Sequence, residues 1–131
     1  MTASSADHTS TNAATLAGKR LALIGAGTMG AAIAGGLSEA GMFPHAMLSI
    51  VDVHWDAAER LAARIPGANA TDLTAALTDA DVVLVCVKPK DVADVLDAVA
   101  RVRAAAPWPL VVSIAAGVTI GRRRGCRPAR R

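Results

Sequence analysis

The sequence is poor in aromatic side chains, with one Phe, two Trp and no Tyr among its 131 residues. Proteins that bind RNA or single-stranded DNA usually stack the bases on aromatic rings, so this composition argues against such a surface. The sequence also lacks any apolar run of the roughly 18 to 20 residues that a membrane-spanning helix needs. We therefore expect no membrane span and no base-stacking platform.

Cysteine is scarce as well. The two cysteines, Cys86 and Cys126, show no C-x-x-C spacing, and nothing suggests a disulfide framework. A reducing, cytoplasmic location is the simplest interpretation. Cys86 lies in an apolar run, where a free cysteine is usually an inert core residue. Neither His45 nor His54 has a partner at metal-ligand spacing, so no metal site is predicted.

The formal net charge of +3 comes from the C-terminal residues. Six of the fourteen basic residues are arginines within residues 121–131, which leaves eight basic against eleven acidic residues elsewhere, a balance of −3. Such a tail could neutralise several phosphates, but it supplies charge without a recognition element. Nucleic acid is therefore the least favoured partner.

Composition divides the chain into three parts. Residues 1–18 are rich in Ser, Thr, Ala and Asn, without periodicity, and predict a disordered leader that resembles neither a secretory signal nor a transit peptide. Residues 19–120 have the apolar patterning of a single folded domain. Residues 121–131 have no apolar periodicity and predict a disordered basic tail.

A G-x-G-x-x-G pattern at residues 25–30 follows a short apolar run and precedes a helical pattern of small residues. This arrangement predicts a strand, a glycine turn and a helix, as in dinucleotide-binding sites. Gly25 permits the tight turn, Gly27 leaves the backbone open to a pyrophosphate, and Gly30 allows close packing of the helix. Ala26, Thr28 and Met29 complete the predicted phosphate-binding segment, where the helix N-terminus favours an anion. A plain glycine-rich turn is the alternative.

A carboxylate follows the second apolar run at Asp52. Its spacing from the glycine pattern is close to the roughly 20 residues expected for a carboxylate that binds the adenosine ribose hydroxyls. Capping of the following helix is the alternative role, because Asp is a good N-cap residue.

The apolar patterns predict strands and helices in alternation. The expected strands are 21–24, 47–51, 68–70, 81–87 and 110–114, and the expected helices are 28–40, 56–65, a short one capped by Thr71 or Asp72, and 91–103. The fold class is therefore α/β, a Rossmann-like, doubly wound parallel sheet of about five strands with helices on both faces. A ligand belongs at the carboxyl ends of the strands, where residues 25–30, 52, 87–89 and 115–117 would meet.

Three segments together resemble pyrroline-5-carboxylate reductase: residues 24–33, Val-Lys-Pro at 87–89, and residues 112–120. The resemblance covers about residues 20–120, the N-terminal cofactor domain of that family. It implies reduction of 1-pyrroline-5-carboxylate to proline with NADPH or NADH, the last step of proline biosynthesis. It also implies that Val87, Lys88 and Pro89 line the nicotinamide ribose and that Ala115 and Ala116 lie beside the nicotinamide ring. Lys88 as a solvated strand end is the alternative.

Two departures from the family pattern bear on function. Family members that favour NADPH usually carry Ser, Thr, Asn or Arg after the second strand, whereas Asp52 would repel a 2′-phosphate and His54 would only partly compensate. After residue 120 the family continues into further elements and a helical domain that forms the dimer and the imine pocket, whereas this chain has its arginine tail. The expectation is a truncated or frameshifted reductase that binds a dinucleotide.

Other functions stay open at this point. The chain could be a dinucleotide-binding fragment without catalysis, or the cofactor domain of a hydroxy-acid dehydrogenase, although residues 113–117 argue against the latter. No Ser-His-Asp or Cys-His nucleophile set is visible, so no catalytic residue is predicted. Hydride transfer from a nicotinamide would not require one.

Overall fold

The computed structural model describes residues 18–42 and 47–115. The predicted leader, apart from Gly18, and the predicted tail therefore lie outside the described residues. Within them the elements alternate as strand and helix along the chain. Their bounds are β1 Leu21–Ile24, α2 Thr28–Glu39, β2 Leu48–Val51, α3 Trp55–Arg64, β3 Asn69–Ala70, α4 Leu73–Thr78, β4 Val82–Val85, the 3-10 turn η2 Pro89–Asp91, α5 Val92–Val102 and β5 Leu110–Ser113.

The strands form one parallel sheet in the order β3-β2-β1-β4-β5. β1 lies at the centre, with Leu21–Ile24 in register with Leu48–Val51 on one side and Val82–Val85 on the other. The order changes direction between β1 and β4, which is the switch point where open α/β sheets bind ligands. The predicted Rossmann-like fold class is confirmed.

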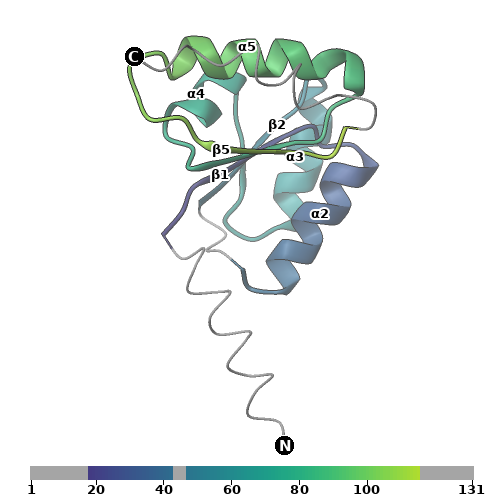
Figure 1. The fold of residues 1–131 in the computed structure, drawn as a ribbon. Helices are drawn as coiled ribbons and strands as arrows, with labels where there is room; N and C mark the ends of the chain where they lie inside the picture. The colour runs from purple at the N-terminus through teal and green to yellow at the C-terminus, as the bar shows by residue number, and fades with distance from the viewer. Residues whose placement is uncertain (1–17, 43–46, 116–131) are drawn as a thin grey trace, which may run out of the picture.

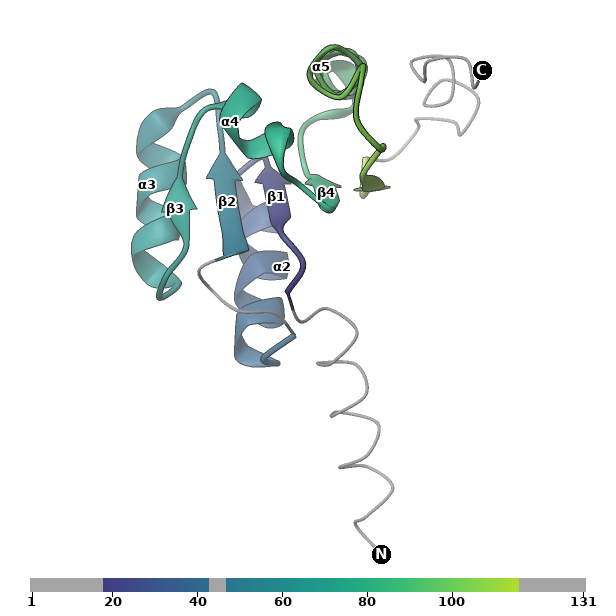
Figure 2. The same ribbon diagram turned by 90° about the vertical axis from the view of Figure 1, so that its left-hand side faces the viewer.

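Helices cover both faces of the sheet. α4 and α5 lie on one face and α2 and α3 on the other, as Figures 1 and 2 show. Strand residues alternate between the two layers: Ala22, Val83 and Val85 face α4 and α5, whereas Leu23, Ile50 and Leu84 face α2 and α3. The central strands are therefore apolar on both faces, as a buried parallel sheet requires.

The predicted elements are all present, with shifted ends. The predicted strand 81–87 was too long, because β4 contains only Val82–Val85. Its apolar sequence continues past the point where sheet pairing stops, and Pro89 then begins a 3-10 turn before α5. Asp72, one of the two predicted caps, accepts a hydrogen bond of 2.8 Å from the Ala75 N–H at the start of α4. α2 ends at Glu39, one residue before the predicted end, and Gly41 follows the C-cap Ala40 with a φ of +63°, which suits glycine.

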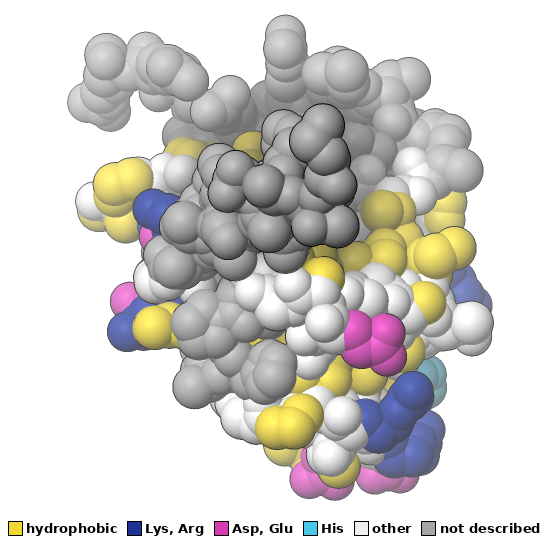
Figure 3. All heavy atoms as spheres, turned by 90° about the horizontal axis from the view of Figure 1, so that it is seen from below, with side chains coloured by type: hydrophobic (Ala, Val, Ile, Leu, Met, Phe, Trp, Pro, Cys, Tyr) yellow, Lys and Arg dark blue, Asp and Glu magenta, His cyan; other side chains and the backbone are white. Residues whose placement is uncertain are grey.

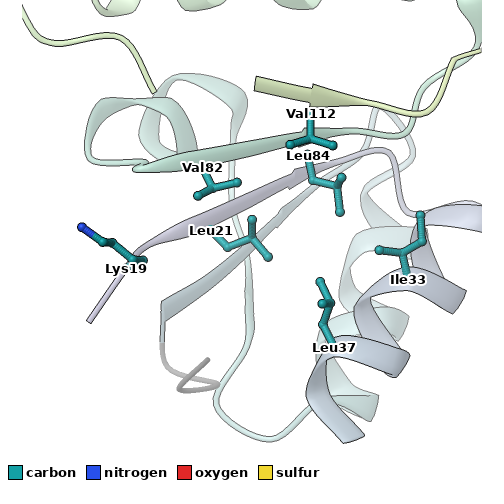
Figure 4. A pocket seen from close by; sticks show the side chains of 7 residues that line it. All are labelled: Lys19, Leu21, Ile33, Leu37, Val82, Leu84 and Val112. Carbon is teal, nitrogen blue, oxygen red and sulfur yellow. The ribbon is translucent and has the colours of Figure 1, made fainter. Parts of the chain in front are cut away.

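β5 lies at the edge of the sheet, and its outer residues are exposed. Leu110 is 64% exposed, Val112 41% and Ile114 40%. Val112 also lines a cavity of about 260 Å³ between the sheet and α2, with Lys19, Leu21, Ile33, Leu37, Val82 and Leu84. Figure 4 shows the strand side chains directed toward Ile33 and Leu37, and Figure 3 shows hydrophobic side chains at the surface on this side of the molecule. On this face β5 is therefore less covered than the central strands, whose residues Leu23, Ile50 and Leu84 are buried.

The segments that lead into β4 and β5 contact a buried cation, Arg103, which is 8% exposed. Its Nη1 donates to the carbonyl oxygens of Leu77, Thr78 and Ala80 at 3.1, 3.3 and 2.8 Å. Its Nη2 donates to the Pro107 carbonyl at 2.6 Å. The guanidinium thus joins the end of α4 to the loop that leads into β5.

Candidate functional site

The glycine turn is held between the ends of two strands. The Gly25 N–H donates to the Val51 carbonyl at 2.8 Å, and the Cys86 N–H donates to the Ile24 carbonyl at 2.8 Å. The carboxyl ends of β1, β2 and β4 therefore lie side by side, and the residues that follow them meet at one edge. This edge is where the sequence predicts the ligand.

Two of the three glycines are required by the backbone itself. Gly25 has φ of +104°, and a Cβ there would lie 2.6 Å from the Cys86 carbonyl oxygen. A Cβ on Gly30 would overlap the carbonyl oxygen of Gly25 and would lie 3.4 Å from the Cβ of Cys86. Both sites exclude a side chain, so the turn and the start of α2 pack in direct backbone contact.

Gly27 differs from the other two. Its φ is −74°, a value open to any residue, and a Cβ there would meet nothing within 4 Å. The space in front of Gly27 is therefore open. A glycine where neither backbone nor packing demands one fits a site that a ligand approaches closely.

The N-terminus of α2 offers unpaired donors next to that space. The first N–H of the helix with an intrahelical partner is that of Ala31, which donates to the Gly27 carbonyl at 2.9 Å. The N–H groups of Thr28, Met29 and Gly30 have no partner within the helix. They lie at the positive end of the helix dipole, which favours an anion. The side chains of Thr28 and Met29 are exposed.

Asp52 is bound to two backbone N–H groups. Its Oδ2 accepts from Ala26 at 2.7 Å and its Oδ1 from His54 at 2.8 Å. The alternative role as the cap of α3 is wrong, because His54 is the N-cap residue and the helix has no side-chain cap. The carboxylate instead joins the turn after β2 to the glycine turn.

A cleft of about 940 Å³ runs along this edge of the sheet. Five predicted site residues line it, namely Gly25, Gly27, Asp52, Val87 and Lys88. Six others are not among the residues that line it, namely Ala26, Thr28, Met29, Gly30, Pro89 and Ala115. Ala116 lies outside the described residues.

Ala115 occupies a distinct position. It follows β5, its N–H donates to the Ser113 hydroxyl at 3.2 Å, and its side chain packs against the core layer under α4 and α5. The sequence left two roles for Lys88, a ligand contact or a solvated strand end. In the structure Lys88 is exposed and lines the cleft.

The sequence reasoning missed much of the cleft lining. His54 and Trp55, which follow Asp52, both line the cleft, and Trp55 is 48% exposed. Further lining residues come from the start of α4 and from α5 and its preceding turn: Thr71, Asp72, Leu73, Lys90, Asp91, Asp94, Val95, Ala98 and Arg101. A Trp three positions after Asp52 was the signal available in the sequence.

Cys86 is half-buried beside the glycine turn, and burial raises the pKa of its thiol to about 11. The thiol is therefore protonated at neutral pH, as an inert core cysteine should be. Among residues 18–42 and 47–115, no group of His, Cys, Asp and Glu side chains could hold a metal ion. In the same part of the chain, no helix is both long enough and apolar enough to cross a membrane.

Residues 20–117 match the family described as NADP oxidoreductase, coenzyme F420-dependent. The chain belongs to this family. The matched region contains the glycine turn, Asp52 and the cleft.

Two curated relatives carry the name pyrroline-5-carboxylate reductase. The protein from Pseudomonas aeruginosa is 42% identical over 103 residues, which are 76% of this chain and 35% of the relative. The protein from Corynebacterium melassecola is 35% identical over 101 residues, 76% of this chain and 37% of the relative. The chain thus spans little more than a third of the length of these relatives.

Solved structures show the same fold. A pyrroline-5-carboxylate reductase from Coxiella burnetii matches with a TM-score of 0.75 at 23% identity, over 84% of this chain and 40% of that protein. The Plasmodium falciparum pyrroline carboxylate reductase, solved with NADP bound, matches with a TM-score of 0.69 at 20% identity, over 85% of this chain and 38% of that protein.

Proposed function

We propose that these residues form the cofactor-binding part of a pyrroline-5-carboxylate reductase, which reduces a cyclic imine with NADH or NADPH. One observation carries the proposal: Gly25, Gly27, Asp52, Val87 and Lys88, from three strand ends, line a single cleft. The two curated relatives named for this activity support the choice of substrate. Because the chain spans about a third of those relatives, imine reduction and oligomer formation are proposed for the whole enzyme, along with a cytoplasmic location.

The residues present fit a dinucleotide. The open backbone at Gly27 and the unpaired N–H groups of Thr28 to Gly30 would hold the pyrophosphate. Asp52 would accept hydrogen bonds from the adenosine ribose. When bound, the nicotinamide would supply the hydride.

The other end of the cleft would position the nicotinamide. Val87 and Lys88 line the wall after β4, and Pro89 turns the chain into η2. Together they would hold the nicotinamide ribose, and Ala115 and Ala116 would lie beside the ring. The half-buried Ala115, with its N–H bonded to Ser113, would form an apolar border that limits access of water.

The first experiment titrates the purified 131-residue chain with NADH and with NADPH, following nicotinamide fluorescence, and assays imine reduction in the same cuvette. Saturable binding is expected for at least one cofactor. Turnover would extend the proposal to catalysis by this chain alone, whereas binding without turnover is the result expected of a cofactor domain. If neither NADH nor NADPH bound, the proposed function would be refuted.

Gly27→Val is the informative variant. Its Cβ would meet nothing within 4 Å and its φ is ordinary, so the fold should be unchanged while the branched side chain blocks the approach of a pyrophosphate. We expect binding to weaken by roughly a hundredfold. Gly36→Val on the same helix is the control, because it is also unobstructed and does not line the cleft. Equal loss in both variants would contradict a phosphate-binding role for Gly27.

A further inference from the structure

We propose that Asp52 makes this chain select a dinucleotide with a free 2′-hydroxyl on its adenosine ribose, as in NADH, over one with a 2′-phosphate, as in NADPH. This inference rests on the proposed function, since it assumes that the cleft binds a dinucleotide. It differs from the NADP in the family's description and from the NADP bound in the Plasmodium falciparum structure.

The position of the carboxylate is fixed from two sides. The Ala26 N–H, in the glycine turn, donates to Oδ2, and the His54 N–H, at the start of α3, donates to Oδ1. Asp52 follows β2 directly, is half-buried and lines the cleft. To move away from an incoming ligand, the side chain would have to break both short hydrogen bonds. A 2′-phosphate would therefore meet the carboxylate where it now lies.

The hydrogen-bonding capacity of the carboxylate suits a hydroxyl. An ionised carboxylate only accepts hydrogen bonds, at about four lone-pair sites. The two backbone N–H groups use two of these, which leaves about two for ribose hydroxyls, each of which is a donor. A phosphate monoester at neutral pH carries a charge of about −1.5 to −2 and offers mainly acceptors. It would bring like charge and no matching donor.

No basic side chain in the described part of the chain forms an ion pair with Asp52. Among the described residues, the single ion pair is Arg20–Asp79, so no side-chain nitrogen of Lys, Arg or His lies within 4.0 Å of the Asp52 carboxylate. Residues 52–56 lead from β2 into the first turn of α3. Apart from His54, the charged side chains in this segment are Asp52 and Asp56, both acidic. A 2′-phosphate site usually relies on a nearby Arg.

The basic residues of the cleft belong to other elements. Lys88 is the N-cap of η2, Lys90 lies in η2, and Arg101 lies in the last turn of α5. The exposed imidazole of His54 is the one basic group in the β2–α3 turn. The turn that would face the adenosine ribose is thus acidic, while the cations line the walls contributed by η2 and α5.

The test uses ligands that probe only the adenosine half of the site. ADP-ribose and 2′-phospho-ADP-ribose differ by the 2′-phosphate alone, and their binding to the 131-residue chain can be compared by isothermal titration calorimetry. NADH and NADPH provide the second pair. We expect the 2′-hydroxyl form of each pair to bind on the order of tenfold tighter or more at low salt, with a smaller ratio at high salt.

Asp52→Asn tests the assignment to this residue. The amide keeps one acceptor oxygen but removes the charge, so the preference for the 2′-hydroxyl ligand should fall by about tenfold even if both ligands bind more weakly. Asp56→Asn is the matched control: it makes the same change nearby, in the first turn of α3, at a residue that does not line the cleft. For this variant, the ratio of the affinities for the 2′-hydroxyl and 2′-phosphate ligands should stay within about twofold of the wild-type ratio.

The outcomes separate the inference from the proposed function. Tighter or equal binding of the 2′-phosphate ligands by the wild-type chain would overturn the inference and leave dinucleotide binding intact. An equal change of ratio in the two variants would also overturn it, because a general charge effect would explain the preference. Failure of all four ligands to bind would refute both. The ratio of ligand affinities measured for the wild-type chain tests the inference even if Asp52→Asn does not fold.

Discussion

The α-carbon of Gly30 lies so close to the carbonyl oxygen of Gly25 that a Cβ on Gly30 would overlap it. The first turn of α2 therefore rests directly on the backbone of the glycine turn. A side chain at this position could be accommodated only if the helix moved away from β1. The relationship makes Gly30 a packing residue as well as part of the predicted phosphate-binding segment.

Gly30→Ala should therefore destabilise the protein. The expected loss is about 1–3 kcal/mol in the free energy of unfolding, the range of an overpacked core. Gly36→Ala on the same helix meets nothing within 4 Å and should instead stabilise by up to about 1 kcal/mol, because Ala is the better helix former. Urea unfolding of the two variants measures both changes. Effects of the same sign and size would contradict the close contact at Gly30.

Arg103→Met should be strongly destabilising. The change keeps a long apolar stem but leaves the carbonyl oxygens of Leu77, Ala80 and Pro107 without the donors that now reach them. We expect a loss of about 2–4 kcal/mol in the free energy of unfolding, measured in urea. Arg101→Met, on an exposed residue two positions earlier, should change it by less than about 0.5 kcal/mol. Similar effects in both would show that the buried guanidinium contributes little.

Leu110→Lys should reduce self-association of the chain. Leu110 is 64% exposed on the edge strand, next to Val112 and Ile114, and an apolar edge strand favours pairing with a second copy. Sedimentation velocity at increasing concentration should show less oligomer for the variant than for the wild type. Val53→Lys adds the same charge at an exposed apolar residue away from β5. If it reduced association as much, net charge and not the edge would be responsible.

Cys86 should react slowly with iodoacetamide at neutral pH. Burial raises the pKa of its thiol from 9.0 to about 11, and only the thiolate is an effective nucleophile. The rate should therefore rise steeply between pH 9 and 11. The same shift affects the free energy of unfolding. The unfolded chain loses the thiol proton near pH 9 and the folded chain near pH 11. The free energy of unfolding should therefore fall as pH rises from 9 to 11. Cys86→Ser supplies the background rate, and fast labelling at pH 7 would contradict the raised pKa.

The sequence predicted the fold, and the edge of the sheet along which the cleft runs, because both depend on local pattern. The apolar runs and the glycine spacing identified the strands and the turn at Gly25. The contribution of α5 to the cleft could not be predicted, since it depends on how that helix crosses the sheet. The link from Asp52 to Ala26 was also missed, because the two residues are distant in sequence and one partner is a backbone N–H. The sequence extended β4 to residue 87 because an apolar run continues where strand pairing does not.

The uneven covering of the sheet has a thermodynamic consequence. Unfolding raises the heat capacity because apolar groups become hydrated, by roughly 12–15 cal/mol/K per residue in ordinary globular domains. Leu110, Val112 and Ile114 are already substantially hydrated in the folded protein. Their share of that increase is therefore small. The free energy of unfolding should therefore curve less with temperature than expected for an ordinary domain with the same number of folded residues.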